Sequence, residues 1–600
     1  MPGRRNFNNE KPKDLKGTTK KLVKEYMIPY KFQLLFMTIF AIAGTIFNIV
    51  GPKILGNATT EIFNGITSKI SGGSGINFEK IAHILITLLV LYVVSGIFSS
   101  FQGFLMTHVA QKISYKMRND IAKKINKLPM KYFDKKTNGE ILSIVTNDVD
   151  TLQQNMNQSI DLLITSVCTI IGIIVMMFSI SVSMTLISLI IFPITVGFIA
   201  FIAKKSQKYF KQQQDYLGHV NGQVEEVYSG HNIVKAFNYE ENAIDKFQDA
   251  NKTLYDSSWK SQFLSGLMMP IMGFMSNISY VLISILGGYY CLQGKITVGN
   301  IQSFIQYSKQ LNQPIQEIAQ IVTSLQSMAA AAERVFEFLD EEEEPVINTN
   351  NKADDLKGNI KFDHVKFGYD ENKIIIHDFN ADVKEGQKIA IVGPTGAGKT
   401  TIVKLLMRFY DINSGKIIID GHDINEYPKE ETRKLFGMVL QDTWLFNGTI
   451  MENIKYGNED KKDSDAIEAA KSAHVHHFIK TLPNGYDMVV NEDSTNISQG
   501  QKQLLTIARV ILDNPKILIL DEATSNIDTM TEVQIQKAMD NLMKGRTSFI
   551  IAHRLSTIKN ADLILVMKHG DIVEQGTHES LLAKNGEYAK LYNSQFEDCQ

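Results

Sequence analysis

The chain has 600 residues, a length that implies more than one domain. Its formal net charge of -2 gives no electrostatic preference for nucleic acid. Three scattered cysteines, Cys168, Cys291 and Cys599, are too few for a disulfide framework or a cysteine metal site. The mean hydropathy of -0.08 averages two unlike halves, because long apolar runs fill the first half and a soluble α/β pattern fills the second.

Six apolar runs in the first half are long enough to span a bilayer, which takes about twenty residues. Their limits are 32–55, 81–106, 159–180, 183–203, 264–292 and 297–325. The last run is made amphipathic by glutamines such as Gln302, Gln306 and Gln313, so we expect it to face protein or water. A soluble helix after the fifth span is the alternative for this run.

Basic residues predict the orientation of these spans. Nine lie between Arg4 and Lys31, and nine more lie between Lys112 and Lys136, after the second span. The segments after the first and fifth spans are poor in them, with Lys69 and Lys295. The positive-inside rule therefore predicts a cytoplasmic N-terminus and, after six spans, a cytoplasmic second half. We expect no cleavable signal, because Lys and Asn dominate before Phe32. Lysine greatly outnumbers arginine, and Asn and Ile are abundant, which indicates an AT-rich bacterial genome. The expected location is therefore a bacterial plasma membrane.

Two long connections, 107–158 and 204–263, are poor in Pro and Gly and predict helices that continue beyond the membrane. Each is interrupted once, at 128–134 and at 229–235. The acidic run Asp340–Glu344 then marks a linker. The predicted organisation is a tail (1–31), a transmembrane domain (32–325), a linker (326–357) and a nucleotide-binding domain (358–600).

The segment Gly393–Thr400 fits the phosphate-loop pattern G-x-x-x-x-G-K-[ST]. It follows a strand-like run, 388–392, and precedes a helix-like run, 401–406. Glycines in such a loop let backbone N–H groups close around phosphate oxygens at a helix N-terminus. Lys399 can reach the β- and γ-phosphates, and the Thr400 hydroxyl can ligate Mg²⁺.

Two further apolar strands end in residues suited to phosphoryl chemistry. The run 517–520 ends in Asp521, which can hold Mg²⁺ through water, and Glu522, which can act as general base. The run 550–552 ends in His553, which can contact the γ-phosphate. For His553 alone, a strand-end residue without a catalytic role is the alternative.

Together these motifs resemble those of the ATP-binding cassette (ABC) transporters. Ser498-Gln499-Gly500-Gln501 is similar to the family signature L-S-G-G-Q, Gln441 to the Q-loop, and Ser525–Asp528 to the D-loop. Tyr369 resembles the aromatic residue that stacks on adenine, and His553 the switch histidine. The segments 129–135 and 230–237 resemble coupling helices. The resemblance implies a six-span α-helical exporter-type transmembrane domain followed by an α/β P-loop domain.

The resemblance also implies the site residues. The catalytic residues would be Glu522, His553 and Lys399. Mg²⁺ would be held by Thr400, Gln441 and Asp521. ATP would be bound by Tyr369, Gly393, Thr395, Gly396, Ala397, Gly398, Lys399, Thr400, Thr401, Gln441, Ser498, Gly500 and Gln501.

In this family two cassettes sandwich two ATP molecules, so the resemblance implies a dimer. Two departures from the family motifs, in a chain whose other site residues are intact, resemble one subunit of the heterodimeric exporters, which have one impaired site. Gln499 replaces a glycine of the signature, and 491–494 keeps only Glu492 of the usual G-E-R-G. A homodimer that tolerates Gln499 is the alternative.

The resemblance thus implies ATP-driven export of amphipathic or lipophilic compounds by a multi-pass protein among membrane lipids, without a nucleic-acid partner. An importer of the same fold, an ATP-gated channel or sensor, and a soluble ATPase are the alternatives; the spans argue against the last. Met268, Met272 and Met275 share a helix face that suits either an apolar pocket or ordinary packing. Asp161, Lys309 and Glu317 lie in or near spans, where ionisable groups are often functional. A position at the cytoplasmic water boundary without such a role is the alternative.

Overall fold

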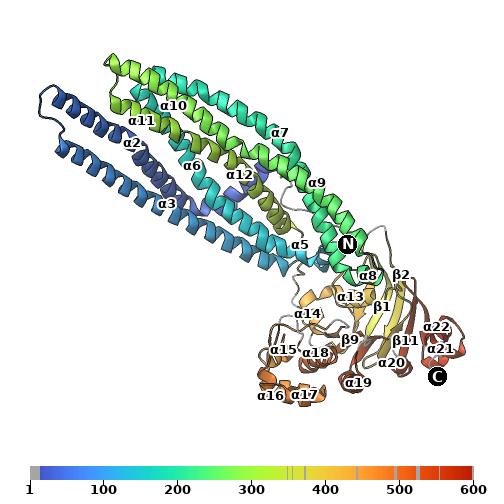
Figure 1. Ribbon diagram of the computed structural model, residues 1–600. Coiled ribbons are helices and arrows are strands. Elements are labelled where there is room, and N and C mark those ends of the chain that lie inside the picture. The colour runs from blue at the N-terminus through green and yellow to red at the C-terminus, as the bar shows by residue number, and fades with distance from the viewer. Residues whose placement is uncertain are drawn as a thin grey trace. The chain divides into compact units, whose positions relative to one another are not determined.

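The computed structural model separates the chain into two compact units, one made of Met1–Asn126 and Asn138–Glu341, the other of Lys127–Thr137 and Glu342–Gln600. Figure 1 shows a bundle of long helices in the first unit and a mixture of strands and short helices in the second. The residues that the structure describes are 14–347, 349, 351–353, 356–370, 373–440, 443–491, 496–521, 527–552 and 555–596.

The first unit is entirely helical where it is described. Its helices are α1 (Leu15–Leu22), α2 (Lys31–Ile70), α3 (Phe78–Ile125), α5 (Asn138–Ser143), α6 (Val149–Ile180), α7 (Val182–Ser229), α8 (His231–Ala236), α9 (Glu240–Gly266), α10 (Met268–Leu292), α11 (Val298–Gln310) and α12 (Asn312–Asp340). The long helices continue past the apolar runs, as the two predicted connections require, and α8 lies in the second of them.

Five helical segments are long and apolar enough to cross a membrane: Lys16–Ile70, Phe78–Ile125, Asn138–Ile180, Val182–Ser229 and Glu240–Leu292. They contain the first five predicted spans. The sixth predicted span, 297–325, is formed by α11 and the first part of α12, which meet at Leu311. This pair is less apolar than the other five segments, so the sixth span stays a prediction.

Residues 326–340, which we expected to begin the linker, are the last part of α12. The helix continues because four consecutive alanines, 329–332, are buried, and small side chains allow close packing. Arg334 fixes this part of α12 to the start of α6, since its Nε donates to Asp148 Oδ2 at 3.1 Å. The connection between the units therefore begins after Asp340.

The second unit is built on a six-stranded sheet with the order β12-β11-β3-β10-β9-β6. Strands β11 (Leu563–Lys568), β3 (Lys388–Val392), β10 (Thr547–Ile551), β9 (Ile517–Asp521) and β6 (Phe436–Val439) are parallel, and β12 (Asp571–Gly576) is an antiparallel edge. A four-stranded antiparallel sheet has the order β2-β1-β4-β5, with β1 (Ile360–Phe367), β2 (Ile376–Val383), β4 (Ser414–Ile419) and β5 (His422–Asp423). Strands β7 (Gly448–Thr449) and β8 (Val489–Val490) form a separate pair.

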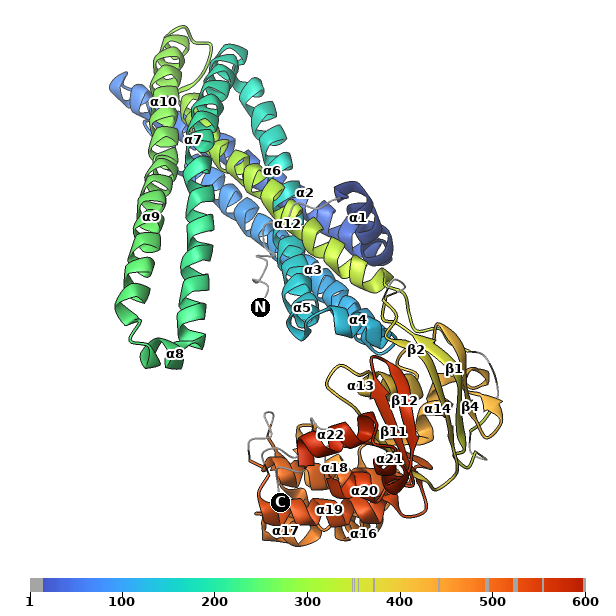
Figure 2. The ribbon, with the colours of Figure 1, turned by 90° about the vertical axis from the view of Figure 1, so that its right-hand side faces the viewer.

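Helices cover both faces of the six-stranded sheet (Figure 2). The helices described in the second unit are α4 (Met130–Lys135), α13 (Lys399–Leu406), α14 (Lys429–Lys434), α15 (Ile450–Lys455), α16 (Asp463–Ser472), α17 (His476–Thr481), α18 (Gln499–Asp513), α19 (Thr529–Met543), α20 (Leu555–Lys559), α21 (His578–Ala583) and α22 (Glu587–Phe596). Continuous apolar runs are typical of parallel strands buried on both faces. In β3, Ile389 and Ile391 join the core of α13, whereas Ala390 and Val392 join the core of α18 and α19.

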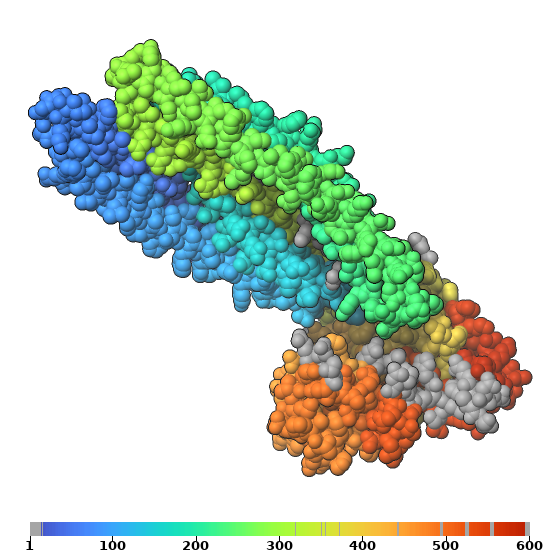
Figure 3. Space-filling model, in the orientation of Figure 1, coloured from blue at the N-terminus to red at the C-terminus, as the bar shows by residue number. Residues whose placement is uncertain are grey.

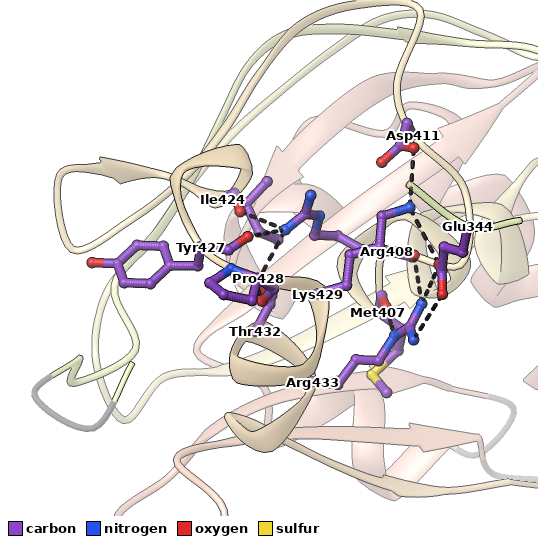
Figure 4. Close-up of polar contacts among 10 residues, drawn as sticks. All are labelled: Glu344, Met407, Arg408, Asp411, Ile424, Tyr427, Pro428, Lys429, Thr432 and Arg433. Carbon is purple, nitrogen blue, oxygen red and sulfur yellow. Dashed lines mark hydrogen bonds and ion pairs between the residues drawn. The ribbon is translucent and has the colours of Figure 1, made fainter. Parts of the chain in front are cut away.

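A polar cluster anchors the beginning of the second unit beside α13 (Figure 4). Glu344 accepts from Arg433 Nη2 at 2.7 Å and pairs with Lys429 Nζ at 3.2 Å, and Lys429 also pairs with Asp411 at 3.1 Å. Arg408, directly after α13, is buried and donates to the carbonyl oxygens of Ile424 and Tyr427. Part of the acidic run predicted as a linker is therefore a fixed contact rather than a solvated segment.

Candidate functional site

Four neighbouring parallel strands bring the predicted motifs to one edge of the sheet. In the register of the strands, Ile551 of β10 lies opposite both Ile391 of β3 and Asp521 of β9. Val439 of β6 lies opposite Leu520 of β9. The segments that follow these strands therefore leave the same carboxyl edge, which is where open α/β sheets bind ligands.

The loop between β3 and α13 has the backbone of a phosphate cradle. Gly393 and Gly398 have φ angles of 154° and 98°, a region that favours glycine. A Cβ at Gly393 would collide with the carbonyl oxygen of Met567, so the loop lies directly against β11. Gly398 is the N-cap of α13 and provides no side-chain cap, which leaves the first N–H groups of the helix open. These features fit a bound triphosphate.

Lys399 is folded back onto this loop. Its Nζ donates to the carbonyl oxygens of Gly393 at 2.7 Å and Pro394 at 3.2 Å. Burial lowers the pKa of Lys399, and the nearby carboxylate of Asp521 opposes that shift. Thr400 is exposed at the start of α13. A hydroxyl and a carboxylate are hard oxygen ligands, so Thr400 and Asp521 fit Mg²⁺.

The other residues of the loop divide into exposed and supporting ones. Thr395 and Gly396 are exposed, whereas Ala397 is buried. The Ala397 carbonyl oxygen accepts from the N–H of Gly570 at 3.1 Å, in the turn between β11 and β12. This turn therefore supports the loop from behind, and nothing in the sequence pattern had indicated it.

Tyr369 belongs to an aromatic cluster next to α13. Its ring makes edge contacts with Phe367 and Tyr410, at centroid distances of 5.0 and 4.9 Å. Its hydroxyl lies 3.3 Å from the Oγ1 of buried Thr401. These contacts fix the orientation of the ring, which suits Tyr369 for stacking on a nucleobase.

The segment 127–137 groups with the second unit and reaches this cluster. Asp134, at the end of α4, pairs with Lys404 Nζ at 2.8 Å and accepts from the Tyr410 hydroxyl. Lys404 in turn lies over the rings of Tyr369 and Tyr410. Hydrogen bonds from Lys404 and Tyr410 lower the pKa of Asp134 despite its partial burial. The sequence indicated the segment 129–135 but not Tyr410. Only the adjacent aromatic residues Phe409 and Tyr410, shortly after α13, could have pointed to it.

The signature segment forms the N-terminus of α18. Ser498 Oγ accepts from Gln501 N, and Gln501 Oε1 accepts from Ser498 N at 3.0 Å, which is a capping box. A Cβ at Gly500 would collide with Thr531, so this glycine is required by packing against α19. Gln499 is exposed, and its Nε2 lies 3.4 Å from Thr443 Oγ1. Because α18 and α13 pack on opposite faces of the sheet, the signature and the phosphate loop belong to different layers.

Several predicted residues lie outside the described part of the chain: Gln441, Glu492, Glu522, Ser525, Asn526 and His553. The strands that precede Gln441, Glu522 and His553 are β6, β9 and β10, which are adjacent. Asp528 is described and caps α19 by accepting from Thr531 N at 2.9 Å.

In the first unit, Glu317 lines a cavity of about 300 Å³ together with Asn48, Gln102 and Thr165. Glu317 accepts from Ser166 at 2.6 Å and Gln313 at 2.9 Å. The amide of Gln102 contacts Asp161. Met272 accepts from Gln316, and Lys309 lies over the Tyr280 ring at 5.5 Å.

Comparisons with known proteins agree with this architecture. Residues 34–315 match the ABC transporter transmembrane region, and residues 376–525 match the ABC transporter domain. The chain is 41% identical to a fatty acid ABC transporter ATP-binding/permease protein of Mycobacterium bovis, with 97% of both chains covered. It is 37% identical to an ATP-dependent lipid A-core flippase of Syntrophus aciditrophicus, with 87% of both covered.

A putative multidrug export ATP-binding/permease protein of Bacillus subtilis is 33% identical, with 95% of this chain and 98% of the relative covered. The structure of a bacterial Atm1-family ABC exporter with ATP bound matches with a TM-score of 0.72 at 28% identity, over 94% of this chain and 98% of that chain. The chain is therefore a member of the ABC transporter family, a membrane-embedded exporter that binds ATP and couples its hydrolysis to transport.

Proposed function

We propose that this ABC exporter moves amphipathic, lipid-like compounds outward across a bacterial plasma membrane, as one half of a heterodimer. ATP as the energy source is supported by the geometry at the carboxyl edge of the six-stranded sheet. The uncapped N-terminus of α13, Lys399 and Asp521 lie together there. The charge pattern supports cytoplasmic placement of this edge, because the basic segments lie on the side where ATP is available.

Each predicted residue of the ATP site would have a separate role. The N–H groups of 395–400 and Lys399 would hold the triphosphate, Tyr369 would stack on adenine, and Thr401 would orient Tyr369. Thr400, Asp521 and Gln441 would hold Mg²⁺, which supplies charge neutralisation at the phosphates. Glu522, directly after Asp521, would take the proton of the attacking water, and His553 would contact the γ-phosphate.

Two chains would complete each site. The signature of α18 and the phosphate loop of α13 pack in different layers, which supports a signature that serves a second cassette. Ser498, Gly500 and Gln501 would then meet the triphosphate held by the partner. Gln499 is exposed at the first position of α18, where the family has glycine, so its side chain would stand in the path of that phosphate. This supports one impaired site and hence an unlike partner.

The substrate class rests on the relatives and on the first unit. Relatives are named for fatty acids, for lipid A-core and for multidrug export. The cavity that contains Glu317 is lined mostly by polar side chains, with Ile49 and Leu162 among the apolar ones, so it would hold the polar end of an amphipathic compound. Met272 and Met275 line a second, smaller cavity, and their flexible thioethers adapt to different apolar shapes.

Transport direction is tested in inside-out vesicles that contain this chain and the half-transporter encoded beside its gene. ATP added outside should make the vesicles accumulate a lipophilic dye, and the Lys399→Ala variant should not accumulate it. ATP-driven loss of preloaded dye would show import instead. Dye movement that is independent of ATP would favour a channel.

The heterodimer is tested by purifying this chain alone and together with that partner. The lone chain should show little ATPase activity, and the pair should show substrate-stimulated turnover. A stable homodimer with full stimulated turnover would overturn the heterodimer and leave Gln499 as a neutral replacement.

A further inference from the structure

A basic and aromatic pocket lies between α7 and α9, and it shares no lining residue with the cavity of Glu317. It has a volume of about 760 Å³, and its walls include Lys204, Lys205 and Lys208 of α7 and Lys260 of α9. Trp259 and Phe263 form the adjoining wall, with their rings stacked at 5.6 Å between centroids. We call these six residues the lysine–tryptophan pocket.

The pocket lies at the boundary between apolar and polar sequence on both helices. In α7 the apolar run 183–203 ends directly before Lys204, and in α9 and α10 the apolar run 264–292 begins directly after Phe263. Tryptophan and lysine at the end of a membrane span are typical of the headgroup layer. The pocket is therefore at the depth where phospholipid headgroups lie.

The two helices are fixed to each other at this level. Ser206 Oγ donates to the carbonyl oxygen of Ser261 at 3.3 Å and lies 3.0 Å from Ser265 Oγ. Ser206 and Ser261 are both buried, so the helix backbones approach closely there. The lysines before and after Ser206 are thus held beside Lys260, and Figure 3 shows the two helices on the surface of the first unit.

The positive charge of the pocket is not neutralised by the protein. Among the described residues, none of the four lysines forms an ion pair, and all four side chains are exposed. Lys205 lies over the Phe201 ring at 5.6 Å and Lys260 over the Tyr209 ring at 5.7 Å, contacts that orient the ammonium groups without removing their charge.

We infer that the lysine–tryptophan pocket binds the phosphate headgroup of an anionic phospholipid. Four ammonium groups supply the opposite charge. Trp259 and Phe263 are 56% and 54% exposed, which suits contact with the glycerol and acyl region of the same lipid. A soluble acidic peptide or free phosphate would leave these rings in water. The inference does not depend on the exported substrate or on the identity of the partner subunit.

The chain contains two tryptophans, Trp259 and Trp444, and the fluorescence of Trp259 reports on lipid in the pocket. Trp444→Phe leaves Trp259 as the only tryptophan of this chain. The variant is assembled with a partner subunit in which every tryptophan is replaced with Phe, and the full transporter is reconstituted into phosphatidylcholine bilayers. A small fraction of brominated phosphatidylglycerol is added in one sample and the same fraction of brominated phosphatidylcholine in another. Each lysine that contacts the headgroup should strengthen binding of the anionic lipid about fivefold. Half-maximal quenching of Trp259 should therefore occur at a lower fraction of brominated phosphatidylglycerol than of brominated phosphatidylcholine.

Replacing Lys204, Lys205, Lys208 and Lys260 with Gln should abolish the preference, and replacing them with Arg should retain it. The matched control replaces four exposed lysines of the same unit, Lys112, Lys123, Lys246 and Lys252, with Gln and should keep the preference. Equal quenching by both lipids, or an equal loss in the control, would overturn the inference. Displacement by inorganic phosphate, beyond that of chloride at equal ionic strength, would assign the pocket to free phosphate instead.

Discussion

Two helix N-termini of the second unit, those of α13 and α18, are built in opposite ways. At α13 the N-cap is Gly398 in the left-handed region, with no side chain to occupy the first N–H groups. At α18 the N-cap is Ser498, and a capping box with Gln501 satisfies two N–H groups from within the chain. Both segments carry family motifs, but only α13 leaves its donors open.

The difference teaches how an anion site is distinguished from an ordinary helix start. Glycine at an N-cap costs only about a few tenths of a kcal/mol relative to serine, so α13 can leave its first N–H groups open to a ligand with little loss of stability. A capped N-terminus is stable alone and must exchange its internal hydrogen bonds to contact phosphate. We therefore expect α13 to govern nucleotide affinity and α18 to govern turnover after assembly.

The largest expected effect is on ATP turnover at the site that contains α13, and it comes from replacing the general base that follows β9. Glu522→Gln should lower steady ATP turnover by roughly 10² to 10⁴, because a general base is removed while its volume is kept. ATP affinity should stay unchanged. Phosphate release and equilibrium binding measure the two quantities, and Glu468→Gln, an exposed carboxylate elsewhere in the cassette, serves as control. Turnover within threefold of the unmodified protein would contradict the assignment.

Lys399→Ala should weaken ATP binding by roughly 10- to 100-fold, the loss expected for a charge-assisted hydrogen bond. The matched control is Lys416→Ala, an exposed lysine of β4. Equilibrium binding of a fluorescent ATP analogue measures the change. Ser498→Ala in the same chain should leave ATP binding unchanged. If it weakens binding as much as Lys399→Ala does, the expectation that α13 governs affinity and α18 governs turnover is wrong.

Gln499→Gly tests the α18 side. Removing the exposed side chain at the first helical position should raise the turnover of the lone chain by about fivefold, which is the effect of one recovered hydrogen bond. Gln499→Ala should give a smaller rise, because a Cβ remains. Unchanged turnover in both variants would indicate that Gln499 does not impair the signature.

The smallest effect is a dependence of ATP affinity on pH. Burial lowers the pKa of Lys399, and a bound triphosphate should raise it, so binding takes up a proton once the free lysine has lost one. Affinity should therefore fall as the pH rises through the pKa of the free protein, below the usual lysine value of about 10.4. Titrations between about pH 7.5 and pH 10 test this. Lys399→Arg should show no such fall, since arginine stays charged.

The sequence predicted what is encoded in periodicity and local motifs. Continuous apolar runs indicated the parallel strands, and the glycines of 393–398 indicated a loop that the structure confirms by its positive φ angles. Packing between distant segments could not be predicted. The extension of α12 through 326–340 depends on buried alanines, and the contact of Asp134 with Tyr410 joins residues far apart in sequence. Roles for Glu522, His553 and Gln441 remain predictions.

One contact described above changes how sequence variants of this exporter should be interpreted. Gly570 lies in the turn after β11, with φ at 91°, and its N–H supports the carbonyl oxygen of Ala397. A Cβ there would collide with the carbonyl oxygen of Ile375. A substitution at Gly570 would therefore displace the phosphate loop from behind, although Gly570 belongs to none of the nucleotide-binding motifs. A comparison of natural variants that scores only the motifs would classify such a variant as neutral, although its expected effect is on nucleotide binding.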